Sequence, residues 1–283
     1  MTEARDVDQV PAVHVEGGKA SAAPVSVRSR ITAASSRLSR VAIGATPFLA
    51  AAIAWYVMAS RQVVDTTFLP SMSSVGRALV NVLINDFYIR DVWVSVYRVI
   101  AAFLLSAVIA VPIGLLAGYH RKTANVVEPF VGFVRYMPVP AFVPLCILWF
   151  GIGDLAKIAV IWLGTFFQLI LLSADVARSV PRDYFEAALT LGAAPRHLFL
   201  RILWPASLPG IVNASRTAVG WAWTYLVVAE IAGATTGIGF RIMEAQRYVE
   251  TPKVFAGIVV IGVLGMMTDL LFHAVQKVCF RWA

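Results

Sequence analysis

Six stretches of the chain are apolar for about 20 residues or more. They cover residues 41–59, 92–119, 127–150, 155–176, 208–232 and 254–275. An α-helix rises ~1.5 Å per residue, so ~20 apolar residues are needed to cross the ~30 Å hydrocarbon core of a bilayer. The pattern therefore predicts an all-α membrane protein with about six transmembrane helices.

The third stretch differs from the others because it contains Pro138, Pro140 and Pro144. Proline removes a backbone donor and breaks the helical hydrogen bonding, which is tolerated at membrane depth only beside protein or a cavity. We therefore expect this span to be kinked or broken and to face the protein interior or a pathway.

The composition agrees with a membrane protein and excludes a soluble enzyme. Of the 283 residues, 59% are hydrophobic and 14% are charged, whereas a soluble domain has ~45–50% and ~25%. Residues 1–40 are rich in Ala, Ser, Val and Arg without apolar periodicity, which predicts a disordered tail before a membrane domain at 41–283.

The distribution of Lys and Arg predicts the orientation. If the N-terminus is inside, the inner side carries roughly twice as many Lys and Arg as the outer side, which is the bias expected of cytoplasmic loops. Both termini and the tail are therefore expected in the cytoplasm. The net charge of +8 is explained by these basic loops, and no nucleic-acid partner is expected.

The inner loop at about 178–206 carries the most informative pattern. Pro181 suits a first helical turn, and Asp183 and Glu186 place negative charge near the N-terminal end of that helix. Gly192 can end the helix in the left-handed conformation. One face of it is small and apolar, and consists of Phe185, Ala188, Leu189 and Gly192. Such a face can dock on another protein, although the loop also fits a hairpin that only connects two spans.

Six residues of this loop are spaced as in a known signature, and they are Glu186, Ala187, Ala188, Gly192, Ile202 and Pro205. Their spacing resembles the signature loop of the permease subunits of binding-protein-dependent ABC importers, with Trp204 where that family usually has leucine. The resemblance implies the type I importer permease fold, in which this loop forms a cytoplasmic coupling helix on an ATPase subunit. The coupling residues it implies are Asp183, Phe185, Glu186, Ala187, Ala188, Leu189 and Gly192.

Three further runs, within 68–71, 135–153 and 216–230, resemble the nitrate, sulfonate and taurine branch of that family. The resemblance implies the pathway-forming subunit of an ATP-driven importer for a small anion, such as nitrate, a sulfonate, taurine or bicarbonate. An uncharged or aromatic nutrient is the alternative. The implied partners are a second copy of the chain, two ATPase subunits and an extracytoplasmic substrate-binding protein, at the bacterial inner membrane.

The chain itself lacks the residues for nucleotide or metal chemistry. It has no Gly-x-x-x-x-Gly-Lys-Ser/Thr loop, and its four histidines show no metal-ligand spacing. We therefore expect a transport subunit without enzymatic activity or cofactor, with ATP and Mg²⁺ bound by the partner ATPase. An ion-driven secondary transporter would need inverted repeats or a carboxylate relay, and a membrane enzyme would need a catalytic constellation; neither is evident.

Charged and aromatic residues within the spans, together with one methionine, are candidates for the translocation pathway. They are Arg135, Met137, Arg216, Trp221, Tyr225 and Glu230. Two arginines at similar depth could bind a passing anion, because guanidinium groups pair well with oxyanions. The alternative is that the arginines pair with carboxylates such as Glu128, Asp175 or Glu230. The glycine-rich segment 233–239 is expected to be a flexible outer loop.

Overall fold

The computed structural model describes residues 46, 47, 49–84, 86–194 and 197–280, and every regular element in these ranges is a helix. The predicted tail at 1–40 and the beginning of the predicted span 41–59 lie outside them. The chain divides into two units between Trp55 and Tyr56, within the apolar helix Leu49–Ser60. The second unit contains all of the longer described helices.

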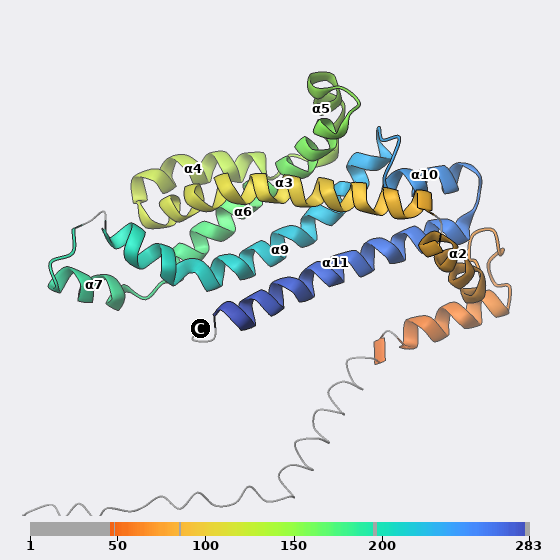
Figure 1. Cartoon of the computed structure of the whole chain (residues 1–283), viewed down its shortest axis with the longest axis horizontal. Coiled ribbons are helices and arrows are strands. Elements are labelled where there is room, and N and C mark those ends of the chain that lie inside the picture. The colour runs from red at the N-terminus through yellow and green to blue at the C-terminus, as the bar shows by residue number, and fades with distance from the viewer. Residues whose placement is uncertain (1–45, 48, 85, 195–196, 281–283) are drawn as a thin grey trace, which may run out of the picture. The chain divides into compact units, whose positions relative to one another are not determined.

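The elements of the second unit follow one another along the chain as α2 (Met72–Ile84), α3 (Asp86–Tyr119), α4 (Arg121–Val134), a 3-10 turn (Val139–Phe142), α5 (Val143–Phe150), α6 (Asp154–Ser179), α7 (Arg182–Thr190), a π-helix (Leu198–Leu203), α9 (Trp204–Ile231), α10 (Ile238–Arg247) and α11 (Thr251–Cys279). The long helices α3, α6, α9 and α11 run side by side, with α6 packed between α3 and α9. The short helices α2 and α10 lie at one end of this bundle, and α7 lies at the other (Figure 1).

Three of the described helices are long and apolar enough to cross a membrane, namely Tyr88–Tyr119, Asp154–Ser179 and Thr251–Cys279. They correspond to the predicted spans 92–119, 155–176 and 254–275. α9 covers residues 208–231 of the predicted span 208–232. It is long enough to cross a membrane but less apolar than these three helices, because Asn213 and Arg216 interrupt it. Leu49–Ser60 is the described part of the first predicted span.

The prediction of a broken third span is confirmed. α4 and the helical segment 139–150 together pass as one span, but they are bent by 84° at residues 135–138. Pro138 has extended backbone angles (φ −67°, ψ 115°) and Pro140 follows within the next turn, so the helical hydrogen bonds stop there. Counted as one span, this pair raises the number of membrane-crossing segments among the described residues to four.

Packing inside the bundle is tight, whereas its outside is apolar. Leu115, Leu169 and Leu203 are all at most 1% exposed and belong to one cluster that joins α3, α6 and the start of α9. By contrast, Met266 and Leu270 on α11 are 58% and 57% exposed. An apolar surface of this kind is suited to contact with lipid or with another membrane helix.

Candidate functional site

The inner loop forms the short helix that the sequence predicts. α7 begins after Pro181 and ends where Gly192 adopts a left-handed backbone with φ 79°. The amide of Ala193 donates to the carbonyl of Ala188 (3.0 Å) and the amide of Gly192 donates to that of Leu189 (2.9 Å). This pair of bonds is the usual glycine-type end of a helix.

The structure places the predicted coupling residues on two sides of α7. Phe185 and Ala188 are half-buried, and the ring of Phe185 lies 5.9 Å from the ring of Tyr119 on α3. The other five are exposed, namely Asp183, Glu186, Ala187, Leu189 and Gly192. Phe185 thus attaches α7 to the bundle, and Glu186 is available to a partner.

Two large apolar residues on the exposed side of this loop were not among those predicted from the sequence. Tyr184 is 55% exposed and Leu191 is 88% exposed. With Ala187 and Ala188 they line a shallow hollow of about 530 Å³, whose other wall is formed by residues 201–206. The spacing 184, 187, 188 and 191 is that of one helical face, and this pattern could have identified them.

Four of the six predicted pathway residues lie around one cavity in the membrane region, and they are Arg135, Met137, Trp221 and Tyr225. The cavity has a volume of about 280 Å³. Its walls come from the bend after α4, from α6 and from α9. Gln168 and Gly164 on α6 also line it, and neither was predicted from the sequence.

Arg135 has no acidic partner among the described residues. Within the described part of the chain, no carboxylate oxygen lies within 4.0 Å of its guanidinium group. Its Nη2 donates to the hydroxyl of Tyr136 at 3.1 Å, and its Cζ lies 4.9 Å from the centre of the Tyr136 ring. The bend exposes both side chains, so Arg135 keeps donors free beside the cavity.

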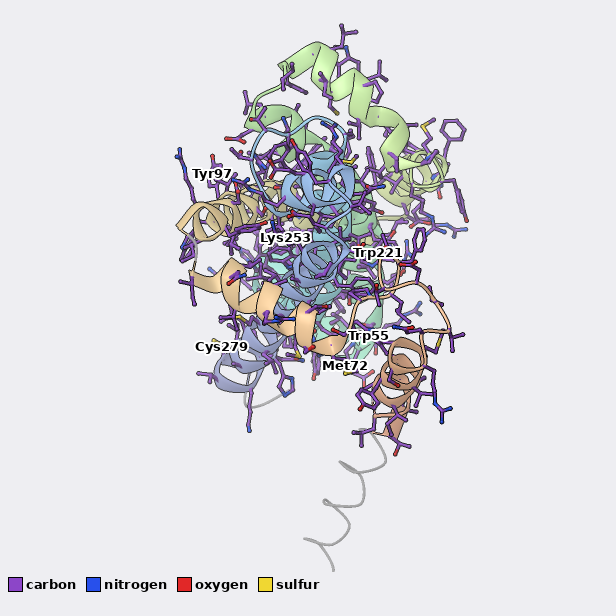
Figure 2. The ribbon with its side chains drawn as sticks, turned by 90° about the vertical axis from the view of Figure 1, so that its right-hand side faces the viewer. Trp55, Met72, Tyr97, Trp221, Lys253 and Cys279 are labelled. Carbon is purple, nitrogen blue, oxygen red and sulfur yellow. The ribbon has the colours of Figure 1, made fainter. Side chains whose placement is uncertain are left out.

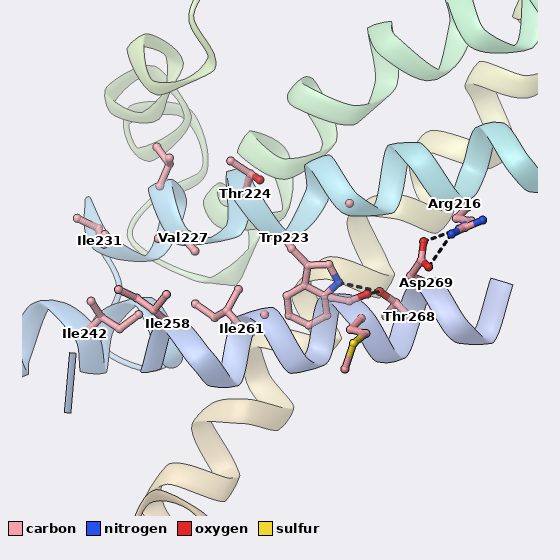
Figure 3. Close-up of a pocket in the computed structure, with 15 residues that line it drawn as sticks. Arg216, Trp223, Thr224, Val227, Ile231, Ile242, Ile258, Ile261, Thr268 and Asp269 are labelled. Carbon is pink, nitrogen blue, oxygen red and sulfur yellow. Dashed lines mark hydrogen bonds and ion pairs between the residues drawn. The ribbon is translucent and has the colours of Figure 1, made fainter. Parts of the chain in front are cut away.

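Arg216 lies in a different place, so the two arginines form no common ring. Its Nη2 donates to Asp269 Oδ2 of α11 at 2.7 Å, and its Nε also bonds this carboxylate. The pair lies at one end of a largely apolar pocket of about 780 Å³ between α9 and α11 (Figure 3). In the same pocket, Trp223 donates to Thr268 at 3.2 Å. The ion pair thus joins α9 to α11.

Glu230 is a member of a buried polar cluster, which we call the Arg98 cluster and which consists of Asp91, Ser95, Arg98, Asp154, Glu230, Thr236 and Arg241. Glu230 is 1% exposed and Arg98 is 2% exposed. Arg98 Nη1 donates to Glu230 Oε1 at 2.6 Å and Arg98 Nη2 donates to Asp154 Oδ1 at 2.5 Å. The cluster joins α3, α6 and α9.

The carboxylates considered as partners from the sequence are bound elsewhere. Glu128 and Asp175 both pair with Arg178, and Glu230 pairs with Arg98. Among the described residues, the three intramembrane arginines therefore differ in their partners. Arg98 and Arg216 each pair with a carboxylate, whereas Arg135 borders a cavity and has no acidic partner.

The expected flexible loop at 233–239 is held firmly at its C-terminal end, which corrects that prediction. The amides of Gly237, Ile238 and Gly239 donate to Asp91 (2.8 Å), Ser95 (3.0 Å) and Glu230 (2.7 Å). All three residues are buried. Glycine allows the close approach here, since a Cβ at Gly237 would overlap the carboxylate of Glu230.

Next to this loop, Arg241 of α10 is also a member of the Arg98 cluster. It pairs with Asp91 and with Glu244. Burial alone would lower the pKa of Arg241, but the hydrogen bonds to these two carboxylates raise it above its usual value. In the described residues, no group of three His, Cys, Asp or Glu side chains could hold a metal ion.

Comparison with known proteins identifies the family. Residues 110–278 match the family described as the binding-protein-dependent transport system inner membrane component. A protein of Brucella melitensis named as an ABC transporter permease is 33% identical over 246 residues, which are 87% of this chain and 99% of that protein. A Bacillus subtilis protein named as an aliphatic sulfonates transport permease, SsuC, is 33% identical over 81% of this chain and 83% of its own length.

Two further comparisons bear on the branch and on the fold. The taurine transport system permease protein TauC of Escherichia coli is 29% identical over 81% of this chain and 85% of its own length. An inward-facing structure of the MetNI methionine ABC transporter matches 68% of this chain and 95% of its own chain with a TM-score of 0.60 at 21% identity, which shows a common fold. The chain therefore belongs to the family of inner membrane components of binding-protein-dependent ABC transport systems, as a multi-pass transport subunit.

Proposed function

We propose that this chain forms the translocation pathway of an ATP-driven importer for a small organic anion. Two copies would assemble with two ATPase subunits, which bind ATP and Mg²⁺, on the α7 side. An extracytoplasmic binding protein would deliver the substrate at the opposite end, with both termini of the chain in the cytoplasm. The observation that carries this proposal is the exposed α7 helix with Glu186 on its surface, at one end of a membrane bundle.

The mechanism follows from the way α7 is attached. When ATP binding brings the ATPase subunits together, each would draw along the α7 helix seated on it. Phe185 packs on Tyr119 of α3, and the π-helix leads directly from the same loop into α9. A displacement of α7 would therefore be transmitted to α3 and to α9. Since α9 lines the cavity, the cavity would open outward. ATP hydrolysis would then restore the inward-facing state.

The substrate class is supported by the cavity and by the relatives. Arg135 offers a guanidinium group to an oxyanion, and Gln168 adds an amide. Trp221 and Tyr225, whose ring centres lie 6.3 Å apart, offer an apolar wall to the rest of the molecule. An aliphatic sulfonate combines both features, and two relatives are named for sulfonate or taurine transport. An aromatic nutrient would use the same wall and is the second candidate.

The substitution Glu186→Lys tests the role of α7. We expect uptake to be lost and ATPase activity to become independent of transport, because the reversed charge would disturb the contact with the ATPase subunit. Glu186 is exposed, so the bundle should remain folded. Uptake by proteoliposomes and ATP hydrolysis by the same samples would be measured. The control is Lys122→Glu, another exposed charge reversal on α4. Normal coupled uptake in Glu186→Lys would exclude α7 as the coupling element.

The substitution Arg135→Gln tests the anion pathway. A charge-assisted hydrogen bond contributes ~1.5–3 kcal/mol, so uptake of taurine or of an aliphatic sulfonate should fall about tenfold or more. Arg216→Gln is the control, because Asp269 already pairs with Arg216 in a separate pocket. Equal uptake in wild type and Arg135→Gln would contradict an anion pathway past Arg135.

A further inference from the structure

The pocket between α9 and α11 is a long groove that opens on the outside of the bundle. Along α9 its lining runs from Arg216 to Ile231, which is ~22 Å at ~1.5 Å per residue. Figure 3 shows the ion pair of Arg216 and Asp269 at one end of the groove and Ile231 at the other. On its rim, Ile258 and Met266 are 55% and 58% exposed. One leaflet of the ~30 Å hydrocarbon core is ~15 Å thick, so the groove is long enough for a complete acyl chain.

Three glycines line this groove, namely Gly220 on α9 and Gly262 and Gly265 on α11. Among the described residues, a Cβ at Gly220 or Gly262 would have no neighbour within 4 Å, and one at Gly265 would meet only Trp223, at 3.8 Å. By contrast, a Cβ at Gly114 on α3 would overlap the backbone of α6, so that glycine serves close packing. Glycine destabilises a helix relative to alanine. The glycines of the groove therefore indicate that the open space itself is used.

The groove lies on a different face of α9 from the cavity beside Arg135. Trp221 lines that cavity, whereas Gly220 and Thr224 line the groove. Figure 2 views the bundle nearly end-on and shows Trp221 and the end of α11 at Cys279 on different sides. Two copies that share a pathway would meet on the cavity side of α9, so the groove would face lipid.

The groove is too narrow to hold a further transmembrane helix. Its volume is about 780 Å³, whereas a helix ~10–12 Å in diameter and ~22 Å long occupies roughly 2,000 Å³. The hydrogen bond from Trp223 to Thr268, at 3.2 Å, also joins α9 to α11 at this place. A helix could only lie over the rim, but an acyl chain is thin enough to enter.

Basic side chains continue the line of the groove beyond its polar end. Asp269, His273 and Lys277 follow one another at intervals of one turn along α11. His273 and Lys277 are exposed, and neither forms an ion pair with another described residue. α11 ends at Cys279, at the same end of the bundle as α7 (Figure 1). Basic groups beside transmembrane helices on the cytoplasmic side attract anionic lipid headgroups.

We propose that this groove binds an anionic phospholipid of the inner leaflet, with one acyl chain along Gly220 and Gly262 and the phosphate beside Lys277. The choice of leaflet rests on the proposed function, which places α7 in the cytoplasm. The chain gains dispersion contacts with walls that otherwise face empty space, and Lys277 faces an opposite charge. A lipid held in this way connects α9 to α11 without entering the cavity beside Arg135.

The test measures thermal unfolding of the complete transporter in phosphatidylcholine nanodiscs that contain a rising fraction of phosphatidylglycerol. A ligand that binds the folded state stabilises it, so the wild-type midpoint should rise until the site is filled. In Gly262→Leu the new side chain fills the groove, so this rise should be lost. The midpoint of Gly262→Leu without phosphatidylglycerol should not fall, because leucine favours a helix more than glycine does. In Lys277→Gln, about five times more phosphatidylglycerol should be needed for half of the rise.

Two matched variants on α4 control for the substitutions themselves. Gly132→Leu makes the same change at another glycine whose Cβ would have no described neighbour within 4 Å. Lys122→Gln removes another exposed lysine. Both should respond to phosphatidylglycerol as wild type does. Native mass spectrometry of the same samples should find phosphatidylglycerol retained by the wild type and both controls, and lost from Gly262→Leu.

Three results would overturn the lipid site. They are a wild-type midpoint that does not respond to phosphatidylglycerol, an equal response in wild type and Gly262→Leu, and a change in the number of copies of the chain in purified Gly262→Leu. The last result would assign the groove to a contact between copies. None of these measurements depends on uptake, so their failure leaves the proposed function intact. Absence of ATP-driven uptake by the wild-type transporter would contradict that function instead.

Discussion

Replacement of Arg98 by methionine is expected to destabilise the protein by ~3–5 kcal/mol, because it removes one partner of a buried ion pair. Glu230 is 1% exposed and would keep only the hydroxyl of Ser95 and the amide of Gly239 as hydrogen-bond donors. Asp154 and Thr236 would lose the same guanidinium group. The midpoint of thermal unfolding in detergent should therefore fall clearly.

The matched control is Arg216→Met. Arg216 also pairs with one carboxylate across two helices, but the side chains of Arg216 and Asp269 are 36% and 45% exposed. Because the carboxylate left behind is not enclosed by the protein, this variant should lose less stability than Arg98→Met. If both variants lost the same stability, burial would not be the reason for the large contribution of the Arg98 ion pair to the stability of the protein.

A double substitution distinguishes the contribution of the ion pair from that of the hydrogen bonds that Glu230 accepts from Gly239 and Ser95. In Arg98→Met with Glu230→Met, no buried carboxylate is left unpaired, because the side chain of Asp154 is 53% exposed. Part of the stability should therefore return. The recovery should be incomplete, because the amide of Gly239 and the hydroxyl of Ser95 then lose their acceptor. A full recovery would show that these two hydrogen bonds contribute nothing measurable.

Much of the helical architecture can be predicted from the sequence, because it depends on local properties. The apolar length of a segment predicts a span, and Pro138 and Pro140 predict the bend. The bounds of α7 follow from Pro181 and Gly192, since each acts through its own backbone conformation. These features depend on the residues of the segment itself, so they can be recognised without knowledge of its tertiary contacts.

The partners of the charged residues could not be predicted, because they depend on how each helix is rotated against its neighbours. Arg98 meets Glu230 over a separation of 132 residues, and Arg216 meets Asp269 over 53. The same limit explains the error at 233–239. Its glycines suggested flexibility. The acceptors for the amides of Gly237 and Ile238, however, lie on α3, more than 140 residues earlier in the chain.

Replacement of Gly164 by alanine is expected to reduce uptake more than tenfold while the transporter still assembles. A Cβ at Gly164 on α6 would overlap the ring of Tyr225 on α9. The ring would have to move, and the ring of Trp221 lies beside it, with 6.3 Å between the ring centres. Overpacking of this kind costs ~1–3 kcal/mol. The displaced ring would occupy part of the cavity of about 280 Å³ in front of Arg135.

A double substitution distinguishes a blocked pathway from general damage to the bundle. In Gly164→Ala with Tyr225→Leu, the smaller side chain leaves room for the new methyl group, so uptake should exceed that of Gly164→Ala alone. Gly132→Ala is the control, because a Cβ there has no neighbour within 4 Å, and it should transport as wild type does. If Gly164→Ala transported normally, the ring of Tyr225 could not limit the pathway, and the substrate would have to pass α6 and α9 elsewhere.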